Sequence, residues 1–193
     1  MTGSSVLPVT IHKGKLYFLF GKENEMEDSA KGYSDFGGGV EAGEAILDTA
    51  FREGGEELTG FLGNGKDLRK HIKSHGGIMK IITKTYHTHL FYLPYDENLP
   101  KYYNANHIFL WERMDKNVLS KTKLFEKIEI DWFSTSDMKR RIREFRPFYQ
   151  ENVREFLKKK SQIRAFIKKC MNKTRKRTHH VRSRNRRSKK NIS

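Results

Sequence analysis

Three glutamates in one short segment are the residues of this chain best suited to chemistry. Glu53, Glu56 and Glu57 are spaced so that, on an α-helix, their carboxylates share one face. Like charges at this spacing repel and destabilise the helix unless a cation binds among them. Carboxylate oxygens are the ligands that hard divalent cations prefer, and such ions often complete their coordination with water and substrate phosphates. The spacing therefore favours a site for Mg²⁺ or Mn²⁺ that acts on a phosphorylated substrate.

The residues that precede the glutamates could complete such a site. A run of glycines at residues 37–39 lets the main chain approach a ligand closely, and its carbonyl groups could supply a further metal oxygen. Arg52 directly precedes the cluster and can pair with Glu56 four positions on, which would hold that carboxylate in place. Glu-rich helix faces are common, however, and the three glutamates alone would more often form a solvated face.

The spacing of the whole segment separates these two interpretations. The fixed positions are Gly38, then after five residues Glu44, after seven more Arg52-Glu53, and after two more Glu56-Glu57. At average residue usage, such a pattern arises by chance in about one in 10⁵ chains of this length. The pattern resembles the signature of the Nudix hydrolases.

This resemblance implies an α/β/α sandwich around a mixed β-sheet. The family hydrolyses nucleoside diphosphates linked to another group and uses Mg²⁺ or Mn²⁺. The likeness extends over roughly residues 6–145, because the order of hairpin, glycine turn, helix, strands, tryptophan-containing strand and late helix is similar. By the same resemblance, Arg52 orients the glutamates, while Gly38 and Glu44 support the motif. The metal ligands that it implies are Glu53, Glu56, Glu57 and the main-chain carbonyl of Gly37.

A further carboxylate is expected shortly before the strand that contains Trp132. The family often places there a group that binds metal or takes the proton from water, and Glu126 is the first candidate, with Glu129 second. Either Glu53 or Glu126 could then act as the general base.

Part of the segment departs from the family pattern. Gly54 stands where the family has an aliphatic residue, and Gly55 follows it, although each glycine costs about 1 kcal/mol relative to alanine inside a helix. Thr59 replaces an expected glycine, and Gly60 takes the normally apolar position after it. The charged residues are intact, so we expect a weaker helix more than a loss of chemistry, although looser packing could misplace the glutamates.

The elements that would position these residues follow from residue patterns. β-Branched and aromatic runs predict strands at residues 6–11, 15–20, 32–36, 78–86, 87–93, 107–114 and 128–133. Helical spacing of apolar residues predicts helices at residues 43–58, 67–74, 138–145 and 147–171.

The positive charge of the chain is concentrated at its C-terminal end. The formal net charge is +16, and residues 158–193 hold 16 of the 39 Lys and Arg but none of the 23 Asp and Glu. We expect a Nudix-like domain at residues 1–146, an amphipathic helix at residues 147–171 and a basic disordered tail at residues 172–193. The tail residues that could bind nucleic acid are Lys173, Arg175, Lys176, Arg177, Arg182, Arg184, Arg186 and Arg187.

A neutral body with a basic arm favours capped RNA as the substrate. Some Nudix hydrolases remove the messenger RNA cap, and a flexible cationic arm would contact several RNA phosphates. We therefore expect decapping that releases a methylated guanosine diphosphate. The alternatives are a hydrolase of ADP-ribose, dinucleoside polyphosphates, damaged nucleotides or inositol pyrophosphates, and an RNA-binding protein that no longer positions metal. The tail could also contact acidic membranes or an import receptor, or keep the protein soluble.

The cysteine count, the lengths of the apolar runs and the N-terminal residues exclude several classes of protein. A single cysteine, Cys170, excludes an internal disulfide framework and a zinc site built from several thiolates. No apolar run approaches the roughly 18 residues that a membrane span needs, and the N-terminus lacks the plan of a signal peptide. We expect an intracellular protein of the cytoplasm or nucleus, or one of viral origin.

Overall fold

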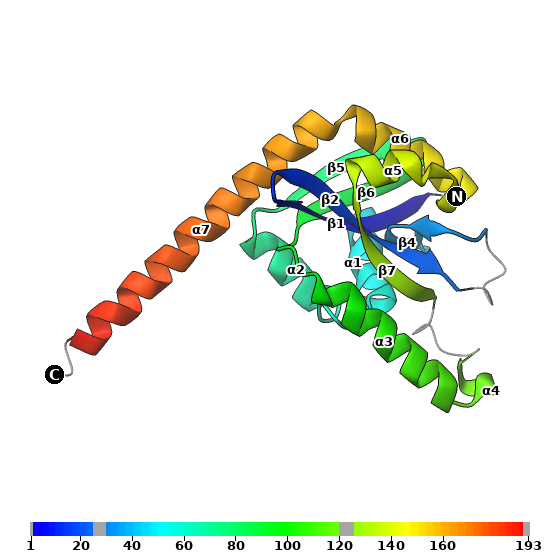
Figure 1. Cartoon of the computed structure of the whole chain (residues 1–193), viewed down its shortest axis with the longest axis horizontal. Coiled ribbons are helices and arrows are strands. Elements are labelled where there is room, and N and C mark those ends of the chain that lie inside the picture. The colour runs from blue at the N-terminus through cyan, green and yellow to red at the C-terminus, as the bar shows by residue number, and fades with distance from the viewer. Residues whose placement is uncertain (1, 25–29, 120–125, 191–193) are drawn as a thin grey trace.

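The computed structural model describes residues 2–24, 30–119 and 126–190, with the side chains of Lys116, Leu119 and residues 176–190 left out. Figure 1 shows a twisted sheet with helices above and below it, and one long helix that projects away. The strands are β1 (Gly3–His12), β2 (Lys15–Glu23), β3 (Tyr33–Ser34), β4 (Phe36–Gly39), β5 (Ile78–Thr83), β6 (Tyr86–Tyr92) and β7 (Lys127–Ser134). The α-helices are α1 (Ile46–Glu57), α2 (Gly65–Ser74), α3 (Asn98–Arg113), α4 (Lys116–Leu119), α5 (Thr135–Arg140), α6 (Gln150–Lys158) and α7 (Lys160–Lys190).

The strands form one mixed sheet. Its main path runs β3-β2-β1-β6-β5, while β4 pairs with β1 and β7 pairs with β2. β1 and β6 are parallel, and the other pairings between these strands are antiparallel. One apolar core joins the sheet to α1, α2 and α3, and a second joins its other face to α5, α6 and the first turns of α7 (Figure 1). The predicted α/β/α sandwich with a mixed sheet is confirmed.

The predicted N-terminal hairpin is present as β1 and β2. Their register pairs His12 with Lys15, so Lys13 and Gly14 make the turn. Both turn residues have positive φ, 46° and 75°, as a tight hairpin turn requires. β1 is buried on both faces because β2 and β4 flank it on one edge, β6 flanks it on the other, and helices cover both sides.

Close packing explains the two glycines inside α1. The helix is continuous from Ile46 to Glu57. A Cβ at Gly54 would overlap Val6 of β1, and one at Gly55 would lie 2.8 Å from the backbone nitrogen of Gly65, where α2 begins. Because these two positions have no side chain, α1 can pack closely against both β1 and α2. This close packing compensates for the low helix propensity of glycine.

Residues 107–114, predicted to be a strand, lie instead mostly in α3. A short apolar and aromatic run does not by itself distinguish a strand from a helix segment. Tyr103 and His107 are buried one helical turn apart, and their ring centroids lie 4.1 Å apart. The Tyr103 hydroxyl donates to the carbonyl oxygens of Glu57 at 2.7 Å and Lys127 at 3.1 Å. These bonds join α3 to the end of α1 and to β7.

The segment after β7 differs from the prediction in detail. The predicted helix at residues 138–145 is divided into α5 and a short 3-10 helix, η2 (Ile142–Glu144). Ser134 caps α5, because its hydroxyl accepts a hydrogen bond from Asp137 N.

The predicted amphipathic helix at residues 147–171 consists of three pieces. A 3-10 helix, η3 (Pro147–Tyr149), leads into α6, and α7 follows α6 after a break at Lys159. The predicted apolar stripe packs against the sheet as expected, and its buried members are Tyr149, Val153, Phe156, Ile163, Ile167 and Cys170.

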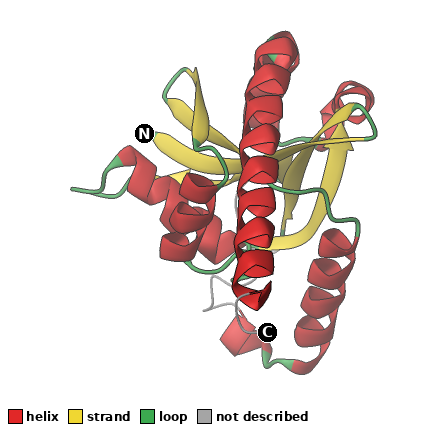
Figure 2. Cartoon of the chain, turned by 90° about the vertical axis from the view of Figure 1, so that its left-hand side faces the viewer, coloured by secondary structure: helices red, strands yellow, loops and turns green. Residues whose placement is uncertain are grey.

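α7 continues to Lys190, although the sequence predicts a disordered tail from residue 172. Residues 160–190 contain no glycine or proline and many Lys and Arg, which are good helix formers, so no local signal stops the helix. The burial ends at Cys170, and Asn172, Lys173 and Arg175 are exposed. Beyond that point α7 leaves the body as a rod, which Figure 2 shows in front of the sheet. In the described ranges, no helix is long and apolar enough to cross a membrane.

Candidate active site

Arg52 is held in place by Glu44, which lies in the turn before α1. Arg52 Nε donates to Glu44 Oε1 at 3.0 Å and Nη2 donates to Glu44 Oε2 at 3.1 Å. Thr49 Oγ1 donates to the same carboxylate at 2.7 Å. Hydrogen bonds from Arg52 and Thr49 lower the pKa of Glu44 to about 2. Glu44 is therefore ionised at neutral pH and fixes the guanidinium by a two-point contact.

From this position Arg52 reaches the glutamates of α1. Its Nη1 donates to Glu53 Oε1 at 2.8 Å and lies 3.5 Å from Glu56 Oε2. Nη2 also lies 3.6 Å from Glu41 in the preceding loop. The pairing of Arg52 with Glu56 that the sequence indicates is present, and Arg52 contacts Glu53 as well.

The glycine strand β4 lies directly against the glutamates. Gly37 N donates to Glu57 Oε2 at 2.8 Å. A Cβ at Gly38 would lie 2.5 Å from Glu53 Oε1, so a larger residue here would displace this carboxylate from the strand. The carbonyl of Gly37 is the group that the family resemblance implies as a metal ligand, whereas the contact seen here is made by its N–H.

Glu57 is the most buried of the three glutamates. Its side chain is 4% exposed, against 11% for Glu53 and 35% for Glu56. Burial raises the pKa of Glu57 well above its ordinary value, the neighbouring Lys127 opposes this, and the charges of Glu23 and Glu126 add to it. A carboxylate in this position needs a cation close by.

Lys127 is that cation, and the sequence patterns do not reveal it. Its Nζ lies 3.3 Å from Glu57 Oε1, pairs also with Glu23, and donates to Ser34 Oγ at 2.9 Å. Burial alone would lower the pKa of Lys127, but Glu57 and Glu23 reverse this and raise it. Glu23 also pairs with Arg146. The one available sequence signal is weak: opposite charges stand at the ends of β2 and β7, whose register pairs Glu23 with Lys127.

The two further carboxylates proposed from the sequence lie in different surroundings. Glu126 immediately precedes β7, is half-buried, and its charge acts on Glu57. Glu129 instead accepts a hydrogen bond from the Tyr33 hydroxyl at 2.6 Å and lies 3.7 Å from Lys22. Glu126 is therefore the candidate that lies near the glutamates of α1.

Asp35, which the sequence patterns also do not single out, anchors the start of β4. It is buried and accepts hydrogen bonds from the hydroxyls of Ser5, Tyr86 at 2.7 Å and Thr88 at 3.0 Å. Burial raises the pKa of Asp35, and the hydrogen bonds from Ser5 and Tyr86 oppose the shift. These bonds tie the glycine strand to β1 and β6.

The site fits a hard divalent cation by its donor chemistry. Glu53, Glu56, Glu57 and Glu126 offer carboxylate oxygens, which Mg²⁺ and Mn²⁺ prefer. Among the described residues, no group of three or more His, Cys, Asp or Glu is already arranged around one point. Arg52 and Lys127 pair with the glutamates, so a metal ion would compete with these two side chains for the same oxygens.

The predicted nucleic-acid-binding residues all belong to α7. Lys173 and Arg175 are exposed on the part that leaves the body. For the other six the helix backbone is placed, and their side chains lie outside what the structure describes: Lys176, Arg177, Arg182, Arg184, Arg186 and Arg187.

Comparisons with solved structures find similar folds. An Ap4A hydrolase from C. elegans is 14% identical over 80% of this chain and 93% of its own, with a TM-score of 0.44. A MutT protein from Methanosarcina mazei Go1 is 20% identical over 83% of this chain and 94% of its own, with a TM-score of 0.43. A Nudix hydrolase from Nitrosomonas europaea is 16% identical over 80% of this chain and 87% of its own, with a TM-score of 0.37. No protein-family model and no curated protein sequence matches the chain.

Proposed function

We propose that this protein is a metal-dependent hydrolase that cleaves the diphosphate linkage of a nucleoside diphosphate joined to another group. The observation that carries the proposal is the contact of Arg52 with Glu44, Glu53 and Glu56 beside the glycine strand β4. A solvated helix face would leave its glutamates free in water, whereas these carboxylates are oriented by an arginine and by the main chain. Such fixed positions are what a catalytic metal site requires.

Glu53, Glu56 and Glu57 would hold Mg²⁺ or Mn²⁺, with Glu126 nearby. When bound, the metal neutralises the charge of a diphosphate and lowers the pKa of water. Arg52, itself fixed by Glu44, keeps the carboxylates of Glu53 and Glu56 in position. Glu53 or Glu126 takes the proton from the attacking water.

The proposed substrate is the 5′ cap of RNA. What supports this is the separation of charge: the body is neutral, and the excess of Lys and Arg lies on residues 158–193, most of which extend from the body as α7. A cationic helix on the same molecule as a hydrolytic site would bind the phosphates of the RNA chain while the cap is cleaved. The products would be a methylated guanosine diphosphate and RNA with a 5′-monophosphate.

A catalytically impaired RNA-binding protein is the second candidate. Lys127 pairs with the buried Glu57, and this observation favours a site in which that carboxylate does not bind metal. The basic rod would then be the functional part of the molecule.

One assay separates the two candidates and tests the substrate. Cap-labelled RNA and a panel of ADP-ribose, dinucleoside polyphosphates and inositol pyrophosphates are incubated with the protein, with and without Mg²⁺ or Mn²⁺. We expect release of the labelled cap only with metal, and loss of at least 10²-fold in rate for Glu56→Gln and Glu57→Gln. Glu112→Gln, on the exposed face of α3, is the matched control and should retain full activity.

The outcomes decide between the proposals. Metal-dependent turnover of small substrates alone would replace decapping with nucleotide or inositol pyrophosphate hydrolysis. Undiminished turnover in the Glu57→Gln variant would refute the assigned site. RNA binding without any metal-dependent turnover would support the impaired protein.

A further inference from the structure

The face of α3 that points away from the sheet carries exposed apolar side chains. With its inner face α3 closes the edge of β7: Asn104 Nδ2 donates to the Ile130 carbonyl at 3.2 Å, and Ile130 N donates to Asn104 Oδ1 at 2.9 Å. On the outer face, Tyr102 is 61% exposed, Ile108 60% and Phe109 53%. Figure 1 shows α3 along the lower border of the molecule. Neighbouring apolar side chains exposed on one helix face are typical of an interaction surface.

The order of residues on this outer face is complementary to itself. Four exposed residues at positions i, i+4, i+7 and i+11 lie along one line of the helix: Lys101, Ala105, Ile108 and Glu112. In a second α3 that runs in the opposite direction, this order is reversed. Lys101 of each copy then lies opposite Glu112 of the other copy, and Ala105 of each lies opposite Ile108 of the other.

The charges on this line favour a second copy in the antiparallel direction. A parallel pair would place Lys101 against Lys101 and Glu112 against Glu112, and like charges repel. The antiparallel pair replaces these repulsions with two ion pairs related by a two-fold axis. The Glu112 side chain is 66% exposed and lies 3.9 Å from Arg113, so its carboxylate is accessible to a lysine of the second copy. Such exposed pairs fix the register more than they add affinity.

The apolar side chains of the outer face would supply the affinity. The small Ala105 leaves a depression in the helix surface, and Ile108 of the second copy can fill it, as ridges fill grooves between packed helices. Tyr102 and Phe109 are two helical turns apart beside this line, so the antiparallel pair also brings Tyr102 of one copy to Phe109 of the other. The guanidinium carbon of Arg113 lies 4.0 Å from the centroid of the Phe109 ring and restricts its motion.

Acidic residues near the outer face disfavour RNA or an acidic membrane as its partner. Exposed carboxylates stand at both ends of α3, with Asp96 and Glu97 before its first residue and Glu112 and Asp115 around its last. Phosphate groups at this face would meet these negative charges. A second copy of the chain brings its own Lys101 instead.

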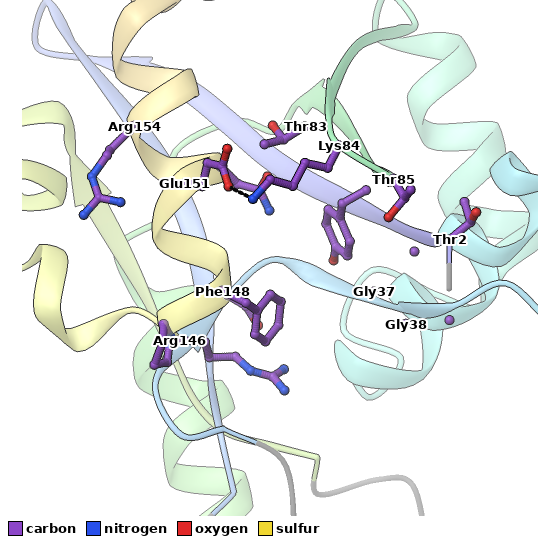
Figure 3. A pocket seen from close by; sticks show the side chains of 16 residues that line it. Thr2, Gly37, Gly38, Thr83, Lys84, Thr85, Arg146, Phe148, Glu151 and Arg154 are labelled. Atoms are coloured by element: carbon purple, nitrogen blue, oxygen red, sulfur yellow. Dashed lines mark ion pairs between the residues drawn. The ribbon is translucent and has the colours of Figure 1, made fainter.

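We propose that α3 forms the interface of a symmetric dimer, in which two copies of the helix pack antiparallel about a two-fold axis between Ala105 and Ile108. The inference is independent of the proposed function. Tyr103, which contacts Glu57 and Lys127, lies on the opposite, buried face of α3. The pocket between β4 and the start of α6 (Figure 3) has no lining residue from α3. Pairing through the outer face therefore leaves the candidate active site and this pocket open, and we expect monomer and dimer to hydrolyse substrate alike.

Sedimentation equilibrium of the full chain, at micromolar to millimolar concentrations, measures the dimer. Ile108→Ser should raise its dissociation constant by about tenfold or more, because Ile108 lies at the centre of the interface. Ile82→Ser is the matched control: Ile82 is 48% exposed on β5, and this variant should dimerise as the unmodified protein does. Thermal unfolding of each variant verifies that it folds.

Charge reversal tests the antiparallel register. Lys101→Glu and Glu112→Lys each place like charges opposite one another, so each should raise the dissociation constant by about threefold or more. The double variant restores opposite charges between the copies and should dimerise as the unmodified protein does. Because Lys101 and Glu112 are about 16 Å apart along one helix, this rescue cannot arise within a single chain.

Three results overturn the dimer: a monomer at every concentration, equal dissociation constants for Ile108→Ser and Ile82→Ser, or a double charge variant that dimerises no better than the single ones. A monomeric chain whose RNA binding falls in Phe109→Ala would also overturn it and would assign this face to nucleic acid.

Discussion

Arg52 and Lys127 show how single cations organise the acidic residues of this protein. Arg52 binds the buried Glu53 and the more exposed Glu56. Lys127 binds the buried Glu57 from the sheet side. Each glutamate therefore has a positive partner, which removes the repulsion expected for three like charges on one helix face.

Because Glu44 pairs with Arg52, the free energy of unfolding should depend on pH in the acid range. Because the pKa of Glu44 falls from 4.5 to about 2 on folding, ionised Glu44 stabilises the folded state above pH 4.5. That contribution is lost as the pH falls toward 2. Glu44→Gln should therefore flatten the pH dependence of the free energy of unfolding between these limits, as measured by urea titration at several pH values.

The control for this prediction is Glu41→Gln, since the Glu41 side chain is 68% exposed and lies 3.6 Å from Arg52. Its acid profile should follow that of the unmodified protein. Identical slopes for Glu44→Gln and the unmodified protein would contradict the assignment.

Lys127 should be essential for stability. Lys127→Met leaves the buried Glu57 without its cation, and loss of one partner of a buried ion pair costs about 3–5 kcal/mol. Lys22→Met is the matched control, because Lys22 is 43% exposed and lies 3.7 Å from Glu129; exposed pairs contribute about 0–1 kcal/mol. Urea unfolding measures both variants. Equal losses would show that Lys127 is not the charge partner described here.

Glycines allow both α1 and β4 to pack closely against their neighbours. Glycines 54 and 55 let the helix approach β1 and α2, and the glycines of β4 let the glutamates rest on that strand. The position of the candidate site therefore depends on how closely α1 approaches β4. The pattern of charged residues alone does not indicate this distance.

The contact between Gly54 and Val6 can be tested by a double-mutant cycle. Gly54→Ala improves helix propensity but overlaps Val6, so we expect a net loss of about 1–3 kcal/mol. Val6→Ala creates room for the new methyl group, and the double variant should lose less than the sum of the single losses. Val9→Ala, on the opposite face of β1, serves as the control and should combine additively with Gly54→Ala. Additivity in the Val6 cycle would refute the contact.

At the scale of the whole molecule, the apolar core and the positive charge are separated along the chain. The buried stripe of the C-terminal helices ends at Cys170, and Asn172, Lys173 and Arg175, which follow it, are exposed. We therefore expect the body to fold without residues 172–193.

Removal of residues 172–193 tests the role of the rod. We expect the melting temperature to stay within about 2 °C, because the removed residues whose side chains the structure describes, 172–175, include no buried one. The slope of log K for RNA binding against log salt should fall by about 0.7 for each phosphate contact removed. A full-length variant with glutamine in place of the Lys and Arg of residues 172–193 separates the effect of charge from that of length. An unchanged slope in both variants would exclude the rod as the RNA-binding part.

The sequence by itself determined the features whose residues are close together in the chain. The spacing of Glu53, Glu56 and Glu57 predicts that they share one helix face. The two strand-forming runs on either side of Gly14 predict a hairpin. The concentration of Lys and Arg near the C-terminus predicts a basic C-terminal part. Each depends on local periodicity or composition, which one chain displays directly.

Only the tertiary structure decided which distant residues complete the site. Glu23, Lys127 and Arg146 are far apart in the chain and meet because β2 pairs with β7 and because the segment after α5 returns to the sheet. Residues 107–113 are helical because Tyr103 and His107 pack as one helix face beside α1 and β7. Such contacts depend on strand register and packing between elements, and local patterns carry no record of either.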